Sequence, residues 1–309
     1  MIRHLALCGG GIKGIVHLGV IKTLIDNKLL DLTMIESVAG TSIGAFIGFL
    51  FVMKFSFSSI KTLIMHQTMS DFLSMDYGKL VMRYGLCDPG KLVEYIDKII
   101  ALKIKKPKPT MADLYAFSRI DFIVSTTNID TGCNELINHV SDPTLQVSQA
   151  IMMSMAIPIL FEPITYKNCH YIDGGITNNY PINAFATKLK DAIGINIACG
   201  CVGSLPISQV TTQASSTSTA PTTTQASQTH LASQSVPYPY FENYLGILLN
   251  VILSDHQHLN KAYTNKTIKI DEIDTTKISM LTFDIPQHYK QELYDIGINC
   301  CYKYIKKNA

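Results

Sequence analysis

The first fifty or so residues contain one pattern twice: a short apolar strand, a glycine-rich turn and an apolar helix. The strands are expected over Ile2–Cys8 and Ile35–Ala39, and the second helix is the apolar run Ile43–Met53. Repeated strand–turn–helix units are typical of a parallel sheet with crossover helices, so an α/β fold is expected. One face of the first helix is expected to carry Ile15, Leu18, Ile21, Leu24 and Ile25.

The rest of the chain continues this alternation, with a mainly helical stretch from Ser56 to Phe117. Further strands are expected at Ile120–Thr126, Glu135–Val140, Ile164–Ile172, Ala192–Ala198 and Thr267–Ile270. Further helices are expected at Gln146–Ala156, Pro181–Leu189, Tyr240–Leu253 and Pro286–Ile305. The pattern predicts a central, mainly parallel sheet flanked by helices.

The segment from Ser204 to Ser235 differs in composition from everything around it. Roughly two thirds of it is Ser, Thr or Gln, and it contains no Asp, Glu, Lys, Arg, Phe, Tyr or Trp. Such a segment cannot bury enough apolar surface to offset the entropy lost on ordering, so disorder is expected. We interpret residues 204–235 as an insertion, with residues 1–203 and 236–309 belonging to one fold.

Composition argues against several classes of protein. A net charge of +2 gives no strong field for nucleic acid. The eight cysteines include no Cys-x-x-Cys pair, so no zinc site is expected. The longest apolar run, Ile43–Met53, is too short for a bilayer span, and the glycines at Gly9 interrupt any signal-peptide pattern. We therefore expect a cytoplasmic location, with peripheral contact at membranes.

The first of three motifs follows the first strand and begins the first helix. Its backbone N–H groups and the positive end of the helix dipole predict a site for an anionic oxygen, either of a phosphate or of a reaction intermediate. A dinucleotide-binding unit would satisfy the same spacing, with Asp31 as its ribose-binding acid. The motif is Gly9-Gly10-Gly11-Ile12-Lys13-Gly14.

The second motif lies between the second strand and the second helix. Gly-x-Ser-x-Gly in this context predicts a nucleophile elbow, in which small flanking residues leave room for a sharp turn. The alternative is a tight turn whose serine has no chemical role. The motif is Gly40-Thr41-Ser42-Ile43-Gly44.

The third motif, Asp173-Gly174-Gly175, would be read as a simple turn if it stood alone. An ordinary α/β-hydrolase places its elbow after several strands and supplies a later histidine, whereas here the elbow follows the second strand. His256, His258 and His288 stay open as partners for Ser42.

Together the three motifs, in this order, resemble those of the patatin-like phospholipase family. The segments Ser154–Pro158 and Phe161–Pro163 before the aspartate, and Asn178–Pro181 after it, also look like family segments. So does the C-terminal helix, which holds Leu293, Gly297 and Tyr304. The resemblance covers most of the chain outside the Ser/Thr/Gln segment, and implies a three-layer α/β fold.

The resemblance also implies a lipid acyl hydrolase of phospholipase A or lysophospholipase type. Ser42 would attack the acyl carbonyl, Asp173 would accept its proton, and the N–H groups around Gly10 and Gly11 would hold the oxyanion. No metal or other cofactor is required by this scheme. Two residues depart from the family pattern. Many members have an acidic or small polar residue at the position of Cys8, and an arginine is common at the position of Lys13.

The expected partners are a phospholipid or other acyl lipid and, transiently, a membrane surface, but no nucleic acid. A basic cluster that could touch anionic headgroups comprises Lys103, Lys105, Lys106 and Lys108. Two alternative functions stay open: a non-catalytic lipid-binding protein, and a nucleotide-binding oxidoreductase that would use the first motif only.

Overall fold

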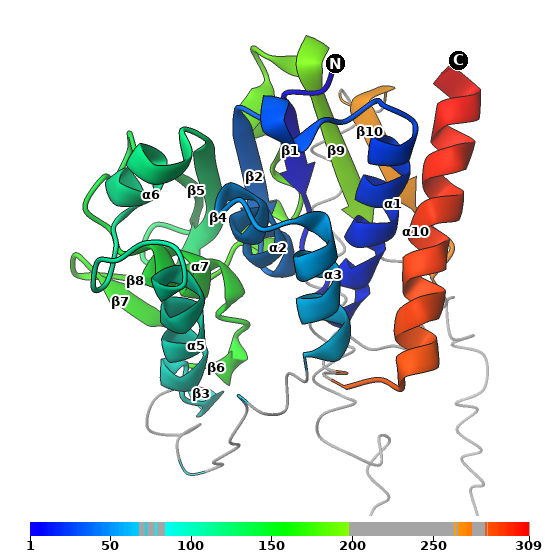
Figure 1. The fold of residues 1–309 in the computed structure, drawn as a ribbon. Coiled ribbons are helices and arrows are strands. Elements are labelled where there is room, and N and C mark those ends of the chain that lie inside the picture. Colours follow the sequence, from blue (N-terminus) through cyan, green and yellow to red (C-terminus); the bar gives the residue numbers. More distant parts are fainter. Residues whose placement is uncertain are drawn as a thin grey trace, which may run out of the picture.

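The fold is built on one eight-stranded sheet with the strand order β10-β9-β1-β2-β4-β8-β7, and β5 pairs with β4 (Figure 1). The computed structural model describes residues 1–67, 72, 78, 84–197, 263, 265–273, 282 and 284–308. The strands of this sheet are β1 (His4–Leu7), β2 (Ser37–Thr41), β4 (Asp121–Asn128), β5 (Cys133–Ile137), β7 (Ile164–Tyr166), β8 (Cys169–Asp173), β9 (Ala192–Ile197) and β10 (Thr267–Ile270).

Five neighbouring strands of this sheet, β10, β9, β1, β2 and β4, are parallel, while β5, β7 and β8 are antiparallel additions beyond them. The prediction of a mainly parallel α/β sheet is therefore confirmed. A second, two-stranded sheet pairs β3 (Gly85–Cys87) with β6 (Ile159–Phe161), and neither strand was predicted from the sequence.

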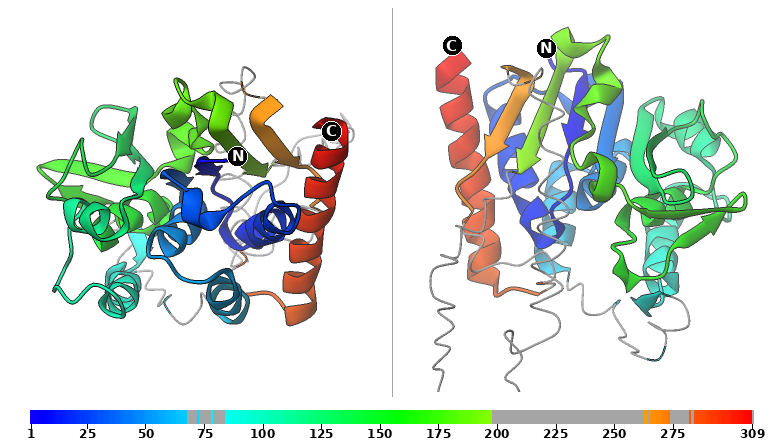
Figure 2. Two further views of the ribbon diagram at one scale, coloured as in Figure 1. Left: turned by 45° about the horizontal axis from the view of Figure 1, so that its top comes forward. Right: turned by 180° about the vertical axis from the view of Figure 1, so that it is seen from behind.

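Helices lie on both faces of the sheet. The α-helices are α1 (Ile15–Asp26), α2 (Ile43–Val52), α3 (Phe57–His66), α5 (Gly90–Ala101), α6 (Met111–Ser118), α7 (Val147–Met155), α8 (Gly175–Asn178) and α10 (Gln287–Asn308). The 3-10 helices are η1 (Gly11–Gly14), η2 (Leu32–Met34), η4 (Pro181–Phe185) and η5 (Leu189–Asp191). Figure 2 shows α1, α3 and α10 together on one side of the sheet.

The alternation of side chains along the strands defines the two faces. A Cβ on Gly48 of α2 would meet Val38 of β2, so Val38 points toward α2. His4 of β1 points the other way, because its ring stacks on Phe185 of η4 at 5.3 Å between centroids. The order is helix, sheet, helix, as the three-layer fold requires.

Two glycines allow α10 to pack closely on α1. A Cβ on Gly19 would lie 2.0 Å from the Tyr294 carbonyl oxygen, and one on Gly297 would lie 2.2 Å from the Val16 carbonyl oxygen. The helix expected at Pro286–Ile305 thus forms and joins the main core. Among the described residues, none of the helices combines the length and hydropathy that a bilayer span requires.

Two predicted elements are wrong in detail. The helix expected at Pro181–Leu189 is instead the two short 3-10 helices η4 and η5, because packing of Phe185 on His4 outweighs the local helical pattern. The single strand expected at Ile164–Ile172 is a hairpin. Lys167 and Asn168 both have positive φ, 47° and 62°, and turn β7 back into β8.

The strand expected at Thr267–Ile270 forms with the same bounds. The other expected elements within the described residues form with shifted ends. The Ser204–Ser235 segment and the helix expected at Tyr240–Leu253 lie outside the described residues.

Candidate active site

The glycine loop and the elbow meet because β1 and β2 are parallel neighbours. Leu7 of β1 is in register with Gly40 of β2, so the residues that follow both strands leave the sheet at one edge. A Cβ on Gly9 would lie 3.2 Å from the Cβ of Ser42. The first two motifs are thus brought together.

Ser42 forms the elbow almost alone. The strand β2 continues through Thr41 and α2 begins at Ile43, so one residue reverses the chain direction. Ser42 takes φ 53° and ψ −125°, a conformation that an L-residue rarely adopts. Such strain persists only where the surroundings fix it, and it is common at functional sites.

The two glycines of the elbow are required by close backbone contacts. A Cβ on Gly40 would lie 2.5 Å from the backbone nitrogen of Ala45. A Cβ on Gly44 would lie 2.3 Å from the carbonyl oxygen of Leu7, at the end of β1. Any larger residue would push α2 away from the sheet, so the motif spacing has a direct steric cause.

Ser154 of α7 holds the backbone of the elbow. Its hydroxyl oxygen accepts the N–H of Ser42 at 2.8 Å and donates to the carbonyl oxygen of Ser125 at 2.6 Å. All three groups are buried, so each hydrogen bond prevents an unpaired polar group in the interior. Sequence analysis placed Ser154 in a family segment but gave it no role.

Asp173 is the last residue of β8, and its side chain is buried. Burial raises the pKa of Asp173 to about 6, although hydrogen bonds from the Gly175 N–H and from the Ser42 side chain favour the ionised form. The Gly175 N–H lies 2.7 Å from Oδ1. The structure therefore places the Ser42 side chain against the Asp173 carboxyl.

The segment after Asp173 joins three parts of the site. The carbonyl oxygen of Asn178 accepts hydroxyl hydrogen bonds from Thr41 at 3.0 Å and from Ser125 at 3.1 Å. A Cβ on Gly174 would lie 2.2 Å from the Ser125 carbonyl oxygen, which explains the glycine there. These contacts fix the position of β8 relative to the elbow.

The members of the glycine loop take different positions. The N–H of Gly9 donates to the Asn179 carbonyl oxygen at 3.1 Å, so it is occupied. Gly10 and Gly11 stand at the start of η1, where N–H groups have no partner within the helix. The Lys13 side chain is buried, and its backbone N–H donates to Gly10.

Gly14 and Ile12 complete that loop. A Cβ on Gly14 would lie 2.7 Å from the side chain of Ile43, so the glycine lets η1 pack on the elbow. Ile12 lines the pocket described below. The candidate oxyanion donors are therefore the N–H groups of Gly10 and Gly11.

His17 supports the loop from beneath, a role that the sequence did not suggest. Its Nε2 lies 2.9 Å from the carbonyl oxygen of Cys8, and burial lowers its pKa to about 4. The neutral ring therefore donates its Nε2–H to Cys8. The Cys8 sulfur in turn accepts the N–H of Ile197 at 3.0 Å.

Of the alternative residues, His288 and Asp31 lie within the described part of the chain, and neither is placed at this site. His288 is exposed and packs against Tyr289, whereas Ser42 is buried, and His256 and His258 lie outside the described residues. Asp31 precedes β2 and caps η2, so it lies at the opposite end of that strand from the glycine loop. A dinucleotide site needs this acid at the same edge as the loop.

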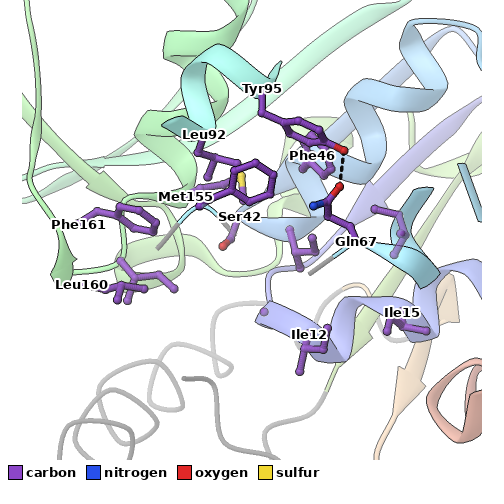
Figure 3. Close-up of a pocket in the computed structure, with 15 residues that line it drawn as sticks. Ile12, Ile15, Ser42, Phe46, Gln67, Leu92, Tyr95, Met155, Leu160 and Phe161 are labelled. Atoms are coloured by element: carbon purple, nitrogen blue, oxygen red, sulfur yellow. Dashed lines mark hydrogen bonds between the residues drawn. The ribbon is translucent and has the colours of Figure 1, made fainter. Parts of the chain in front are cut away.

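An apolar pocket, partly open to solvent, begins at Ser42 (Figure 3). Most of its wall comes from aliphatic and aromatic side chains of η1, α1, α2, α3, α5, α7 and the strand β6. The lining residues are Gly11, Ile12, Ile15, Ser42, Ile43, Phe46, Ile64, Gln67, Phe72, Leu92, Tyr95, Met155, Ile157, Leu160 and Phe161.

The basic cluster lies away from this pocket. Leu92 and Tyr95 line the pocket from the first half of α5, whereas the four lysines follow its C-terminal end. Lys106 pairs with Asp113 at 2.7 Å, and Lys103 donates to the carbonyl oxygen of Lys54. The cluster is therefore separated from the pocket by much of the length of α5.

Comparison with known proteins identifies the family. The model of the patatin-like phospholipase family matches residues 5–186, which is more than half of the chain. The chain belongs to the patatin-like phospholipase family. The match contains all three motifs and ends before β9, so α10 and β10 lie beyond it.

Relatives of this patatin-like chain occur in viruses and yeasts. It is 32% identical to an uncharacterized protein of Acanthamoeba polyphaga mimivirus, over 64% of this chain and 66% of that protein. It is 26% identical to a probable lipid hydrolase of Invertebrate iridescent virus 6, over 59% and 62%. A lysophospholipase of Candida albicans is 25% identical over 62% of this chain but only 13% of its own length. The matches thus span slightly less than two thirds of the two viral relatives.

Among solved structures, VipD from Legionella pneumophila has a similar fold. The TM-score is 0.61 with 13% sequence identity, over 99% of this chain and 67% of VipD. At this identity the likeness concerns the fold alone, and it agrees with the three-layer arrangement above.

Proposed function

We propose that this patatin-like protein is a lipid acyl hydrolase of phospholipase A or lysophospholipase type, with a Ser42–Asp173 dyad. The observation that carries the proposal is the contact between the strained Ser42 and the buried Asp173 at the apolar pocket. The family membership and the relatives named as lipid hydrolase and lysophospholipase support the same substrate class.

In the proposed mechanism, Ser42 Oγ attacks the ester carbonyl while Asp173 takes the hydroxyl proton and passes it to the leaving alcohol. The raised pKa of Asp173, about 6, makes it a stronger base than an ordinary aspartate. Water then attacks the acyl-enzyme, loses its proton to Asp173, and releases the fatty acid as the proton returns to Ser42.

The oxyanion formed in both steps would be held by the N–H groups of Gly10 and Gly11. His17 positions these donors through Cys8, because it fixes the carbonyl just before the loop. Preorganised donors of this kind are typically the largest electrostatic contribution to acyl transfer.

The substrate would be a phospholipid, lysophospholipid or other acyl lipid whose chain occupies the apolar pocket. Reaching a lipid in a bilayer requires transient contact at the membrane surface. The position of the lysines beyond the far end of α5 favours contact through the pocket rim instead of through that cluster.

The test combines covalent labelling with turnover. A fluorophosphonate probe should label the wild-type protein at Ser42 and fail to label Ser42→Ala, and only the wild-type protein should release fatty acid from a long-chain ester. Binding of the lipid without labelling or turnover would favour the non-catalytic lipid-binding alternative. Saturable binding of a nicotinamide nucleotide without ester hydrolysis would favour the oxidoreductase.

A further inference from the structure

The apolar pocket contains one polar pair apart from Ser42. Gln67 follows α3 and Tyr95 belongs to α5, and both line the pocket. The Tyr95 hydroxyl donates to Oε1 of Gln67 at 2.7 Å (Figure 3). No lining residue of the described chain carries a formal charge, so the pair and Ser42 supply the polar side chains of this pocket.

The Tyr95 ring is held in place by aromatic neighbours. Its centroid lies 4.7 Å from that of Phe72 and 6.4 Å from that of Phe46. Figure 3 shows Tyr95, Phe46 and Gln67 close together on the same side of Ser42. A ring packed in this way presents its hydroxyl from a fixed position, which is a condition for recognition by hydrogen bonds.

A buried lysine from outside the family match holds Gln67. Lys290 of α10 donates from Nζ to the carbonyl oxygens of Met65 and of Gln67, both at 2.9 Å. These carbonyls stand at the C-terminal end of α3, where a positive charge is favourable. Burial nevertheless lowers the pKa of Lys290, so its ammonium group is kept in the interior at a cost.

We propose that Tyr95 and Gln67 form a hydrogen-bonding subsite for a hydroxyl group of the bound lipid, and that Lys290 positions this subsite. The proposal rests on the acyl hydrolase function above and adds a substrate class to it, namely acyl lipids with a hydroxyl near the ester or along the chain.

The chemistry of the pair favours a hydroxyl. A phenolic oxygen that donates one hydrogen bond can still accept another, so Tyr95 can accept from a donor on the lipid. An unsubstituted methylene chain covering the pair would exclude water from it and return no hydrogen bond. A lipid hydroxyl restores that bond, so the pocket discriminates against the lipid that lacks it.

Two kinds of lipid supply such a hydroxyl, and two matched substrate pairs distinguish them. The first pair is a lysophospholipid with a free glycerol hydroxyl and its methyl ether, which accepts but does not donate. The second pair is a hydroxystearoyl ester and the stearoyl ester of the same alcohol. The wild-type protein should prefer the hydroxyl member of one pair by roughly tenfold in kcat/KM, through KM more than kcat.

Three variants should remove this preference. Tyr95→Phe deletes only the hydroxyl, Gln67→Leu deletes its acceptor, and Lys290→Met removes the charge that positions Gln67. Each should bring the kcat/KM ratio between the two members of the preferred pair near one. Lys290→Arg should keep part of the preference, because it restores the donors. The control Tyr166→Phe removes another tyrosine hydroxyl bond, to Asp142 at 3.2 Å, and should leave the ratio unchanged.

Binding separates this proposal from the catalytic one. The Ser42→Ala protein should bind the hydroxyl member of the preferred pair about tenfold more tightly, and Ser42→Ala with Tyr95→Phe should not. Equal binding of both members of both pairs would overturn the hydroxyl subsite even if wild-type hydrolysis is normal. Selective binding without any hydrolysis by the wild-type protein would instead overturn the hydrolase and leave the subsite standing.

Discussion

Around Ser42, close backbone contacts leave almost no choice of residue type. The pocket wall, in contrast, is made from apolar side chains of several helices and the strand β6, and other apolar side chains could replace them. A Cβ on Gly40, Gly44 or Gly174 would overlap main-chain atoms of a neighbouring segment. In the wall, residues such as Ile64, Leu92 and Leu160 meet only the requirement of being apolar and of suitable size. Under the proposed function, the loops around Ser42 would define the chemistry, and the wall would define which lipid reaches Ser42.

The largest expected loss of stability comes from adding a side chain within the elbow, and this change tests whether the backbone there is as restrictive as described. Gly44→Ala should destabilise the protein by about 3 kcal/mol or more, because its Cβ would lie 2.3 Å from the Leu7 carbonyl oxygen. The control is Gly132→Ala, at φ 67° with no atom within 4 Å, which should cost about 1 kcal/mol for the backbone alone. Urea unfolding measures both, and similar values would show that the elbow tolerates a side chain.

The pH dependence of stability tests the burial of Asp173. Its folded pKa of about 6 lies above the ordinary 3.8, so its contribution to stability is complete below pH 3.8 and lost as the pH rises through 6. Asp173→Asn cannot ionise and should be more stable than the wild-type protein at pH 8, by up to about 3 kcal/mol.

At pH 4 that advantage should largely disappear, since Asp173 is then mostly protonated in the folded protein. Unfolding of both proteins in urea across this range gives the difference directly. A variant less stable than the wild-type protein at pH 8 would contradict a buried carboxylate with a raised pKa.

A smaller effect is expected where a side chain supports the elbow. Ser154→Ala leaves the Ser42 N–H without its acceptor at 2.8 Å, and kcat should fall roughly tenfold with little change in KM. Ser141→Ala, which removes an exposed hydroxyl bonded to the Asn138 N–H, serves as the control. A normal kcat for Ser154→Ala would show that turnover does not depend on the hydrogen bond between Ser154 and the elbow, and that Ser154 is as replaceable as the residues of the pocket wall.

The smallest effect is expected from removing metal ions. In the part of the chain that the structure describes, the one grouping with metal-ligand chemistry is Asp271, Glu272 and Cys300, and Glu272 pairs with Lys303. A chelator should therefore leave hydrolysis within error of the untreated enzyme. Loss of activity that calcium alone restores would contradict a metal-independent serine mechanism.

The same comparison explains what the sequence could predict. The glycines that contact backbone atoms lie within short motifs, at positions close together in the sequence. The three motifs and the α/β alternation could therefore be predicted from the sequence. Ser154 lies 112 positions from Ser42, and Gln67 lies 28 positions from Tyr95. No local sequence pattern could therefore predict either contact. The segment Pro181–Leu189 was misjudged for a related reason, because the contact of Phe185 with His4 is also distant in sequence.

The central claim is that Asp173, and no histidine, serves as the base for Ser42, and turnover of purified variants tests it most directly. Long-chain ester hydrolysis would be measured for Asp173→Asn, Ser42→Ala, the double variant, and His256→Gln, His258→Gln and His288→Gln, with circular dichroism confirming the fold.

Asp173→Asn should lose roughly a hundredfold to ten-thousandfold in kcat, since the amide cannot take the serine proton. The double variant should be little worse than Ser42→Ala, because the two groups act as one unit. Each histidine variant should keep most of the activity. A folded Asp173→Asn enzyme with near-normal turnover, or a histidine variant as inactive as Ser42→Ala, would contradict the dyad.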